Sequence, residues 1–199
     1  MSVEFQFDFP RTLAAVTYIA SKDIPDLTMY KILKILFLAD KCHLVKYGRT
    51  LTGDRYSALP DGPVPSRVYD FFSKQVLKKP FSVEGRKIVA NLAFDRKLKY
   101  PVFRATVPHD ADELSKSDIS ALDYAINEFW NLDYNQLKAI THKYPAYKKA
   151  WEARPKGRDS VLMNVEDLFE GDPAALAGAK EAMLENDHIA KLFAKRRAV

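Results

Sequence analysis

The densest apolar run of the chain lies between residues 29 and 47, with the sequence MYKILKILFLADKCHLVKY. When this run is drawn as a helix, apolar side chains occupy nearly every side, which predicts a helix buried at the centre of the fold. Asp40 and His43 fall in the same helical row as core leucines, one turn apart. The four lysines of the run lie on other rows, where we expect them to reach water: Lys31, Lys34, Lys41 and Lys46.

The carboxylate of Asp40 needs a partner, because an ion that is buried without one destabilises the fold strongly. We expect that partner to be Arg55, Arg67 or backbone N–H groups of the loop that follows the helix. Gly48 supplies a left-handed residue, which predicts that the helix ends after Tyr47.

Two turns follow this helix and enclose a short strand. Gly53-Asp54 predicts the first turn and Asp61-Gly62-Pro63 predicts the second. The residues between the turns, 55–59, include Tyr56 and are typical of a brief strand. Another helix is predicted over residues 64–77.

The rest of the chain alternates between helical and strand-like patterns. An apolar face predicts a helix over residues 11–21, and a short amphipathic helix is predicted over residues 188–199. Residues 87–94 and 100–107 predict two strands joined by a turn at 95–97, which would form a sheet together with residues 55–59. Four residues carry helix-start signals: Ser115, Asp133, Asn164 and Asp172.

Together these elements predict an α+β fold that is mainly α, a compact helical domain with a central buried helix and a small antiparallel β-sheet. A chain of 199 residues with 47% hydrophobic content can bury one core, so we expect a single domain over residues 1–199. The single cysteine, Cys42, excludes an intrachain disulfide framework. With neither a signal peptide nor a membrane-length apolar run, the sequence predicts a cytoplasmic protein with no membrane partner.

Charge is distributed unevenly along the chain, although the formal net charge is only +5. Residues 74–104 hold nine basic residues against two acidic ones, and residues 110–133 hold seven acidic residues against one lysine. A basic block of this kind can meet an acidic protein or nucleic acid, or it can pair with its acidic neighbour. Pairing of the basic block with its acidic neighbour is the simplest interpretation, and we give it the most weight.

Residue types alone give little support for catalysis or metal binding. Asp40 and His43 offer two metal ligands, with His142 or His109 as a third, but a structural contact between Asp40 and His43 requires fewer assumptions. Cys42 in a buried helix is expected to be inert. The sequence contains no nucleophile elbow, P-loop, dinucleotide fingerprint or HExxH pattern, so we expect no enzyme, no metal and no cofactor.

Three blocks of the chain carry a resemblance to a known family: KILKILFLAD, KYGRTLTGDRY and GPVPSRVYD. Their helix, turns and polar residues resemble the Panacea domain, the antitoxin domain of the SocA-like and phage-associated protein group. Two later blocks, LSKSDISALDYAIN and AITHKYPAYKKAW, are similar to the later helices of that family. The resemblance places the family signature at residues 29–72 and implies that the C-terminal helices, residues 164–199, are more variable.

The resemblance implies an antitoxin of a bacterial or prophage toxin–antitoxin system, with a cognate toxin as its partner. Members neutralise their toxins by direct contact, and the SocA-like type delivers its toxin to a bacterial AAA+ protease as an adaptor. The signature residues carried over to this chain, with no catalytic role assigned, are Asp40, His43, Gly48, Gly53, Asp54, Tyr56, Gly62, Pro63, Val64 and His142.

Two other functions stay open as alternatives. A transcriptional regulator would bind DNA through the basic segment 74–104, although no helix-turn-helix signal stands out. A hydrolase would use Asp40, His43 or His142 as general acid and base, although no substrate-binding motif accompanies them.

Three surfaces are candidates for the toxin contact: the basic hairpin within residues 74–104, the aromatic region 144–151 and the helices after Asn164. We favour the hairpin, because its charge can attract an acidic partner and its edge can accept an added strand. The contact residues predicted from the first two surfaces are Arg96, Lys97, Lys99, Tyr147 and Trp151. The aromatic part of this prediction fails if Tyr147 and Trp151 are fully buried.

Overall fold

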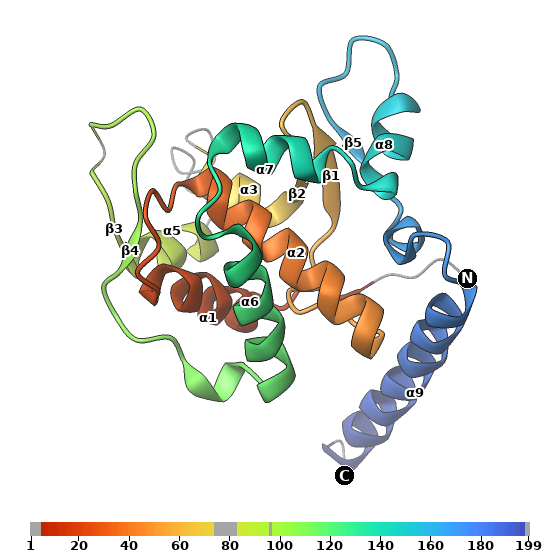
Figure 1. Cartoon of the computed structure of the whole chain (residues 1–199). Helices are drawn as coiled ribbons and strands as arrows, with labels where there is room; N and C mark the ends of the chain where they lie inside the picture. The colour runs from red at the N-terminus through yellow and green to blue at the C-terminus, as the bar shows by residue number, and fades with distance from the viewer. Residues whose placement is uncertain (1–4, 74–82, 96, 198–199) are drawn as a thin grey trace.

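Helix α2 (Met29–Tyr47) covers the residues predicted for the central helix and runs through the middle of the molecule (Figure 1). The computed structural model describes residues 5–73, 83–95 and 97–197, with side chains up to residue 185. Thr28 begins α2, because its hydroxyl accepts a hydrogen bond from the Lys31 amide (3.4 Å). Gly48, with φ at 70°, ends the helix in the left-handed conformation, as predicted.

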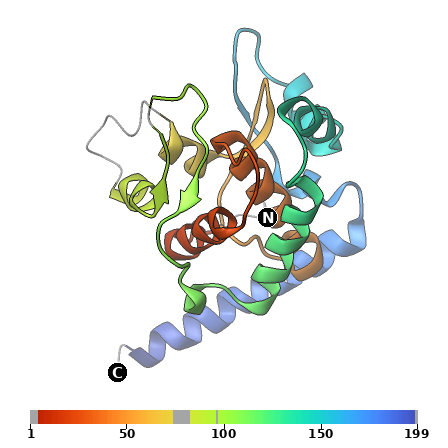
Figure 2. The same ribbon diagram turned by 60° about the vertical axis from the view of Figure 1, so that its left-hand side comes forward.

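Other helices cover α2 on several sides. α1 (Phe9–Ser21), α6 (Lys116–Phe129) and α7 (Tyr134–Thr141) all contact it, and α6 does so most extensively (Figures 1 and 2). Every side chain from Lys31 to Asp40 is buried. The predictions of a mainly helical α+β fold and of a buried central helix are therefore confirmed.

The prediction that all four lysines of α2 reach water was wrong for Lys31 and Lys34, which are both buried. Neighbouring elements cover every row of the N-terminal half of the helix, so a lysine there has no open side. Lys31 Nζ instead donates hydrogen bonds to the carbonyl oxygens of Pro25 (3.2 Å) and Trp130 (3.1 Å). A buried ammonium group requires such acceptors.

Among the described residues, five short strands form two small sheets. The first sheet has the order β2-β1-β5, with β1 (Tyr56–Leu59) in the middle. Its neighbours, β2 (Gly62–Pro65) and β5 (Val161–Leu162), both run antiparallel to it. The second sheet is the pair β3 (Leu92–Ala93) and β4 (Arg104–Ala105).

Three predicted elements differ from the structure in this region. The hairpin does pair antiparallel, but it forms its own sheet instead of joining residues 55–59. Residues 87–90 belong to helix α5 (Val83–Ala90), because the buried Ile88 lies on one helical face. The helix predicted from residue 64 begins at Ser66 as α3 (Ser66–Phe72), since two prolines hold Gly62–Pro65 extended in β2. Residues 74–77 of that prediction lie outside the described residues.

The C-terminal half follows its helix-start signals. Ser115 and Asp133 each form a reciprocal capping box, at the starts of α6 and α7. Asn164 begins the short 3₁₀-helix η2 (Val165–Phe169), and another 3₁₀ turn, η1 (Ala111–Glu113), precedes α6. Along the chain, α8 (Pro145–Glu152) follows α7 and precedes β5.

The separate tail helix predicted from residue 188 was wrong, because a single helix, α9 (Pro173–Arg197), runs through this region. Its start was predicted, and the side chain of Asp172 accepts hydrogen bonds from the amides of Ala174 and Ala175 (both 3.0 Å). The helix packs closely on the end of α2, where a Cβ at Gly48 would lie 3.0 Å from the Cα of Ala179. Among the described helices, none has the length and apolarity needed to cross a lipid bilayer.

Candidate functional site

Asp40 is fully buried and is held by the loop that follows α2. Its Oδ1 accepts hydrogen bonds from the amides of Leu51 (2.7 Å) and Thr52 (2.8 Å), and its Oδ2 accepts one from the Thr52 hydroxyl (2.6 Å). Of the three partners considered from the sequence, the backbone N–H groups are confirmed, whereas Arg55 and Arg67 are exposed. Burial raises the pKa of the Asp40 carboxyl, and these hydrogen bonds oppose the rise.

Asp54 connects this loop to the start of α3. Its carboxylate accepts hydrogen bonds from the amides of Arg55 (2.7 Å), Arg67 (2.9 Å) and Val68 (3.1 Å). Because Pro65 supplies no side-chain cap, Asp54 provides the anion that the N-terminus of α3 requires. Burial raises the pKa of Asp54 to about 6.

The glycines of the signature allow close contacts between backbone segments. Gly53 has φ at 67°, and a Cβ there would lie only 1.9 Å from the carbonyl oxygen of Gln6. Gly62, with φ at 97°, lies at the turn between β1 and β2. A Cβ on Gly62 would lie 2.7 Å from the Thr141 hydroxyl and 2.8 Å from Lys34 Nζ. Both positions therefore require glycine.

Lys34 holds the same turn from inside the core. Its side chain is completely buried, and Nζ donates a hydrogen bond to the carbonyl oxygen of Pro63 (2.8 Å). Nζ also lies 4.9 Å from the centre of the Tyr30 ring. Burial lowers the pKa of this amine to about 7. This role of Lys34 was not predicted from the sequence, although a lysine inside an all-round apolar helix, four residues after a tyrosine, was a usable signal.

A row of rings leads from this turn to the surface along α8. The rings of His142 and Tyr147 are 4.6 Å apart, and those of Tyr147 and Trp151 stack at 6.1 Å. The Arg154 guanidinium then lies 3.8 Å from the Trp151 ring centre. Tyr147 is buried and donates a hydrogen bond to the carbonyl oxygen of Leu59 (2.9 Å), so it is not accessible to a partner. Trp151 is only partly buried.

His43 does not contact Asp40, contrary to the expected pair. Because the two side chains leave α2 at different angles, His43 Nδ1 meets the carbonyl oxygen of Arg49 (2.9 Å), and Nε2 meets Asp118 Oδ1 (3.1 Å) and Ser117 Oγ (3.1 Å). Burial alone would raise the pKa of Asp118, but hydrogen bonds from His43 and Ser115 and the Arg49 charge hold it well below its usual range. This cluster joins α2 to α6.

The described part of the chain contains no assembled site for metal binding or for thiol chemistry. No group of three or more potential metal ligands comes together there. His142 packs against the Tyr147 ring, whereas His43 binds Asp118. Cys42 is partly buried, and burial raises the pKa of its thiol, which disfavours the reactive thiolate.

The hairpin predicted as a contact surface is exposed. Lys97 and Lys99 both lie on the loop between β3 and β4, whereas Arg96 lies outside the described residues. Arg104, at the end of the basic segment, instead donates a hydrogen bond to the carbonyl oxygen of Ile24 (3.0 Å).

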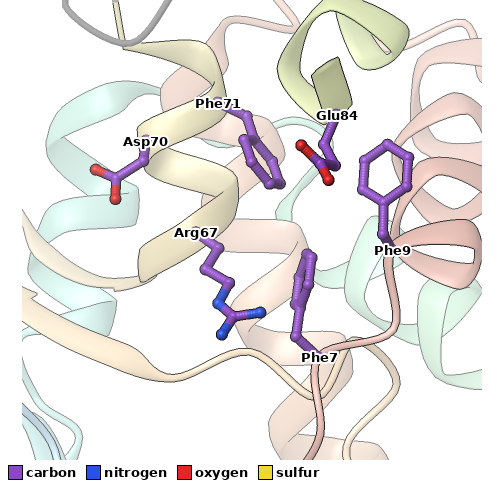
Figure 3. A pocket seen from close by; sticks show the side chains of 6 residues that line it. All are labelled: Phe7, Phe9, Arg67, Asp70, Phe71 and Glu84. Carbon is purple, nitrogen blue, oxygen red and sulfur yellow. The ribbon is translucent and has the colours of Figure 1, made fainter. Parts of the chain in front are cut away.

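A hollow of about 440 Å³ opens beside α3 and α5 (Figure 3). Arg67 lies over the Phe7 ring at 4.8 Å, and Glu84 projects from the opposite side. One cation and two carboxylates surround the rings, so the lining favours no single ligand chemistry. Its six lining residues are Phe7, Phe9, Arg67, Asp70, Phe71 and Glu84.

The whole arrangement connects one loop, one hairpin and α3 to the central helix, and the sequence that forms it matches the model of a known family. A family model described as Antitoxin SocA-like, Panacea domain, matches residues 32–151, more than half of the chain. The chain belongs to this family. No match was found among curated proteins or among solved structures.

Membership of the Panacea family supports an antitoxin-type function with a toxin as the general kind of partner, and suggests a non-enzymatic role. The matched range includes the buried groups described above, from Lys34 to His142. It excludes α1 and α9. Among the signature residues, Asp40 and Asp54 accept hydrogen bonds mainly from backbone amides, whereas His43 also bonds the side chains of Ser117 and Asp118.

Replacement of Asp40 tests this structural role. We expect Asp40→Ala to lower the free energy of unfolding by about 3–5 kcal/mol, because it leaves the buried amides of Leu51 and Thr52 without an acceptor. Asp40→Asn keeps one acceptor oxygen, and we expect a loss of about 1–2 kcal/mol. Urea denaturation measures both losses, and equal stability of the alanine variant and the wild type would contradict the role.

The buried amine of Lys34 predicts a pH dependence of stability. Between pH 7 and pH 10.5 the unfolded chain keeps this proton while the folded chain releases it, so stability should rise with pH. Relative to Lys34→Met, the wild type should gain at most about 1.4 kcal/mol per pH unit over this window. Urea denaturation of both proteins at several pH values measures the difference, and a flat difference would show that the amine keeps its ordinary pKa.

Proposed function

We propose that this protein is an antitoxin that neutralises a cognate toxin by direct protein–protein contact. The observation that carries the proposal is the match to the SocA-like Panacea domain over residues 32–151. The geometry supports it, because the carboxylates of the signature residues Asp40 and Asp54 bind backbone amides and so serve the fold. Specificity for a toxin must then come from the outer surface.

The contact surface that we favour is the hairpin loop between β3 and β4, of which the structure describes residues 95 and 97–102. Leu98 is 50% exposed and Tyr100 is 69% exposed, which is unusual for large apolar side chains. Lys97 and Lys99 alternate with them, and Lys99 Nζ lies 5.1 Å from the Tyr100 ring centre. Exposed aromatic groups provide contact energy, and the lysines attract an acidic partner.

Charge and aromatic contact, more than strand addition, support this surface. β3 and β4 are only two residues long, so they offer a short edge to an added strand. The backbone just after the loop is also less open to an added strand, because the Phe103 amide already donates a hydrogen bond to the carbonyl oxygen of Leu27 (2.8 Å).

Neutralisation can proceed by blocking the toxin or by delivering it to a AAA+ protease, and both modes begin with this contact. Expression of the neighbouring open reading frame alone should arrest growth, and co-expression with this protein should restore it. Repetition in a host that lacks the protease separates the modes, since only blocking would still rescue growth. The proposal fails if no neighbouring gene is toxic, or if co-expression leaves a toxic one active.

The double variant Lys97→Glu/Lys99→Glu tests the hairpin loop. We expect toxin affinity to fall by about tenfold or more and its salt dependence to weaken, because the variant repels an acidic surface. Calorimetric titration at two salt concentrations measures both effects, and thermal stability should stay within a degree or two of wild type.

Lys156→Glu/Arg158→Glu is the matched control, because it reverses two exposed basic residues in the connection between α8 and β5. It should bind the toxin as the wild type does. Equal losses in both variants would mean that overall charge decides affinity and that the loop is not the contact surface.

A further inference from the structure

The two arms of the hairpin loop are fixed where they leave β3 and β4, at the edge of the molecule beside α1 and α5 (Figure 1). Phe94, at the end of the first arm, packs against Phe103 of the second arm, with ring centres 4.9 Å apart. Phe103 is buried, and its ring centre lies 5.4 Å from that of Phe72 in α3. These aromatic contacts attach the base of the loop to the core.

The second arm is also attached to the connection between α1 and α2. Val102 forms an antiparallel bridge with Thr28, the residue that begins α2. The Arg104 guanidinium donates a hydrogen bond to the carbonyl oxygen of Ile24 (3.0 Å). The loop therefore projects from a base that is held by two separate parts of the fold.

Local chemistry restricts the loop itself. The Asp95 carboxylate accepts a hydrogen bond from the Lys97 amide (2.9 Å), and the Asp95 carbonyl oxygen accepts one from the Leu98 amide (3.3 Å). These bonds stabilise a turn at the start of the loop. Tyr100 precedes Pro101, and a residue before proline is restricted to extended backbone conformations. The side chains of the loop are thus positioned before a partner arrives, which lowers the entropic cost of binding.

The ring of Tyr100 stands out at the tip of this loop. At 69% it is the most exposed large apolar side chain among the described residues, and Leu98 beside it is 50% exposed. The Lys99 ammonium lies 5.1 Å from the centre of the ring. A partner that encloses the ring must therefore also accept a cation at the edge of the contact.

The carboxylates near the loop are engaged at its base. Asp95 binds a backbone amide of the turn, and Asp23 lies 3.8 Å from the Arg104 guanidinium. Within the described part of the chain, neither Lys97 nor Lys99 forms an ion pair. The outer part of the loop is therefore aromatic and basic.

We propose that Tyr100 is the anchor of the toxin contact and enters an apolar cleft on the toxin that is rimmed by carboxylates. This inference rests on the proposed function, and it adds the shape and the chemistry of the partner's surface. A projecting loop with a ring at its tip requires a concave partner, because a flat surface would leave most of the ring in water. Lys97 and Lys99 remain at the mouth of the cleft, where they face its carboxylates.

Calorimetric titration with the toxin that the neighbouring open reading frame encodes tests the anchor. Tyr100→Ala should lower affinity by about tenfold or more at low and at high salt alike, because salt does not screen apolar contact. The negative heat-capacity change of binding should become smaller in this variant. Tyr100→Phe keeps the ring, so its affinity should stay within about threefold of wild type.

Tyr124→Ala is the matched control, because it removes another exposed ring, on α6, and should bind as the wild type does. Thermal denaturation checks that each variant is folded. Unchanged affinity in Tyr100→Ala, a loss that disappears at high salt, or an equal loss in Tyr124→Ala would overturn the anchor.

Co-expression separates this failure from a failure of the proposed function. If the wild type restores growth and Tyr100→Ala binds the toxin with unchanged affinity, the protein is an antitoxin whose anchor lies elsewhere. If the wild type does not restore growth, the antitoxin proposal fails and the anchor fails with it.

Discussion

The carboxylate of Asp40, buried inside the central helix, is the constraint on which the rest of the structure depends. It must be met by donors, and the amides of Leu51 and Thr52 meet it, which turns the chain back along α2. Asp54 then lies in position to bind the first amides of α3. The loop and α3 are thus fixed by two buried acids, whose desolvation is compensated by backbone donors.

The hairpin between β1 and β2 is held by a buried basic group, in contrast to the two buried acids that hold the loop and α3. Lys34 reaches Pro63 from within α2, and the missing side chain of Gly62 leaves room for Thr141. Because α7 carries Thr141 and α8 carries Tyr147, this contact also places the helices that follow in the chain. A molecule that commits Asp40 and Asp54 to its own backbone amides is suited to present its outer surfaces to partners.

The sequence predicted those features that depend on local chemistry. Gly48 ends the central helix as expected, and Ser115 and Asp133 start α6 and α7 as expected, because caps are determined by a few neighbouring residues. The partners of His43 and the bond from Lys34 to Pro63 could not be predicted, since they depend on which distant segments pack on α2. Residues 87–90, which were predicted as part of the hairpin, form a helix instead. In this helix Ile88 is buried against the rest of the fold, and a strand pattern alone does not reveal such burial.

Hydrogen–deuterium exchange of the protein, alone and with its co-purified toxin, tests most directly whether the signature is a rigid frame and the hairpin loop is the contact surface. The account predicts that the amides of Leu51, Thr52 and Val68 exchange slowly in the free protein and change little on binding. Toxin should add protection to residues 95–102. Fast exchange at the signature amides in the free protein, or new protection confined to them, would contradict the account.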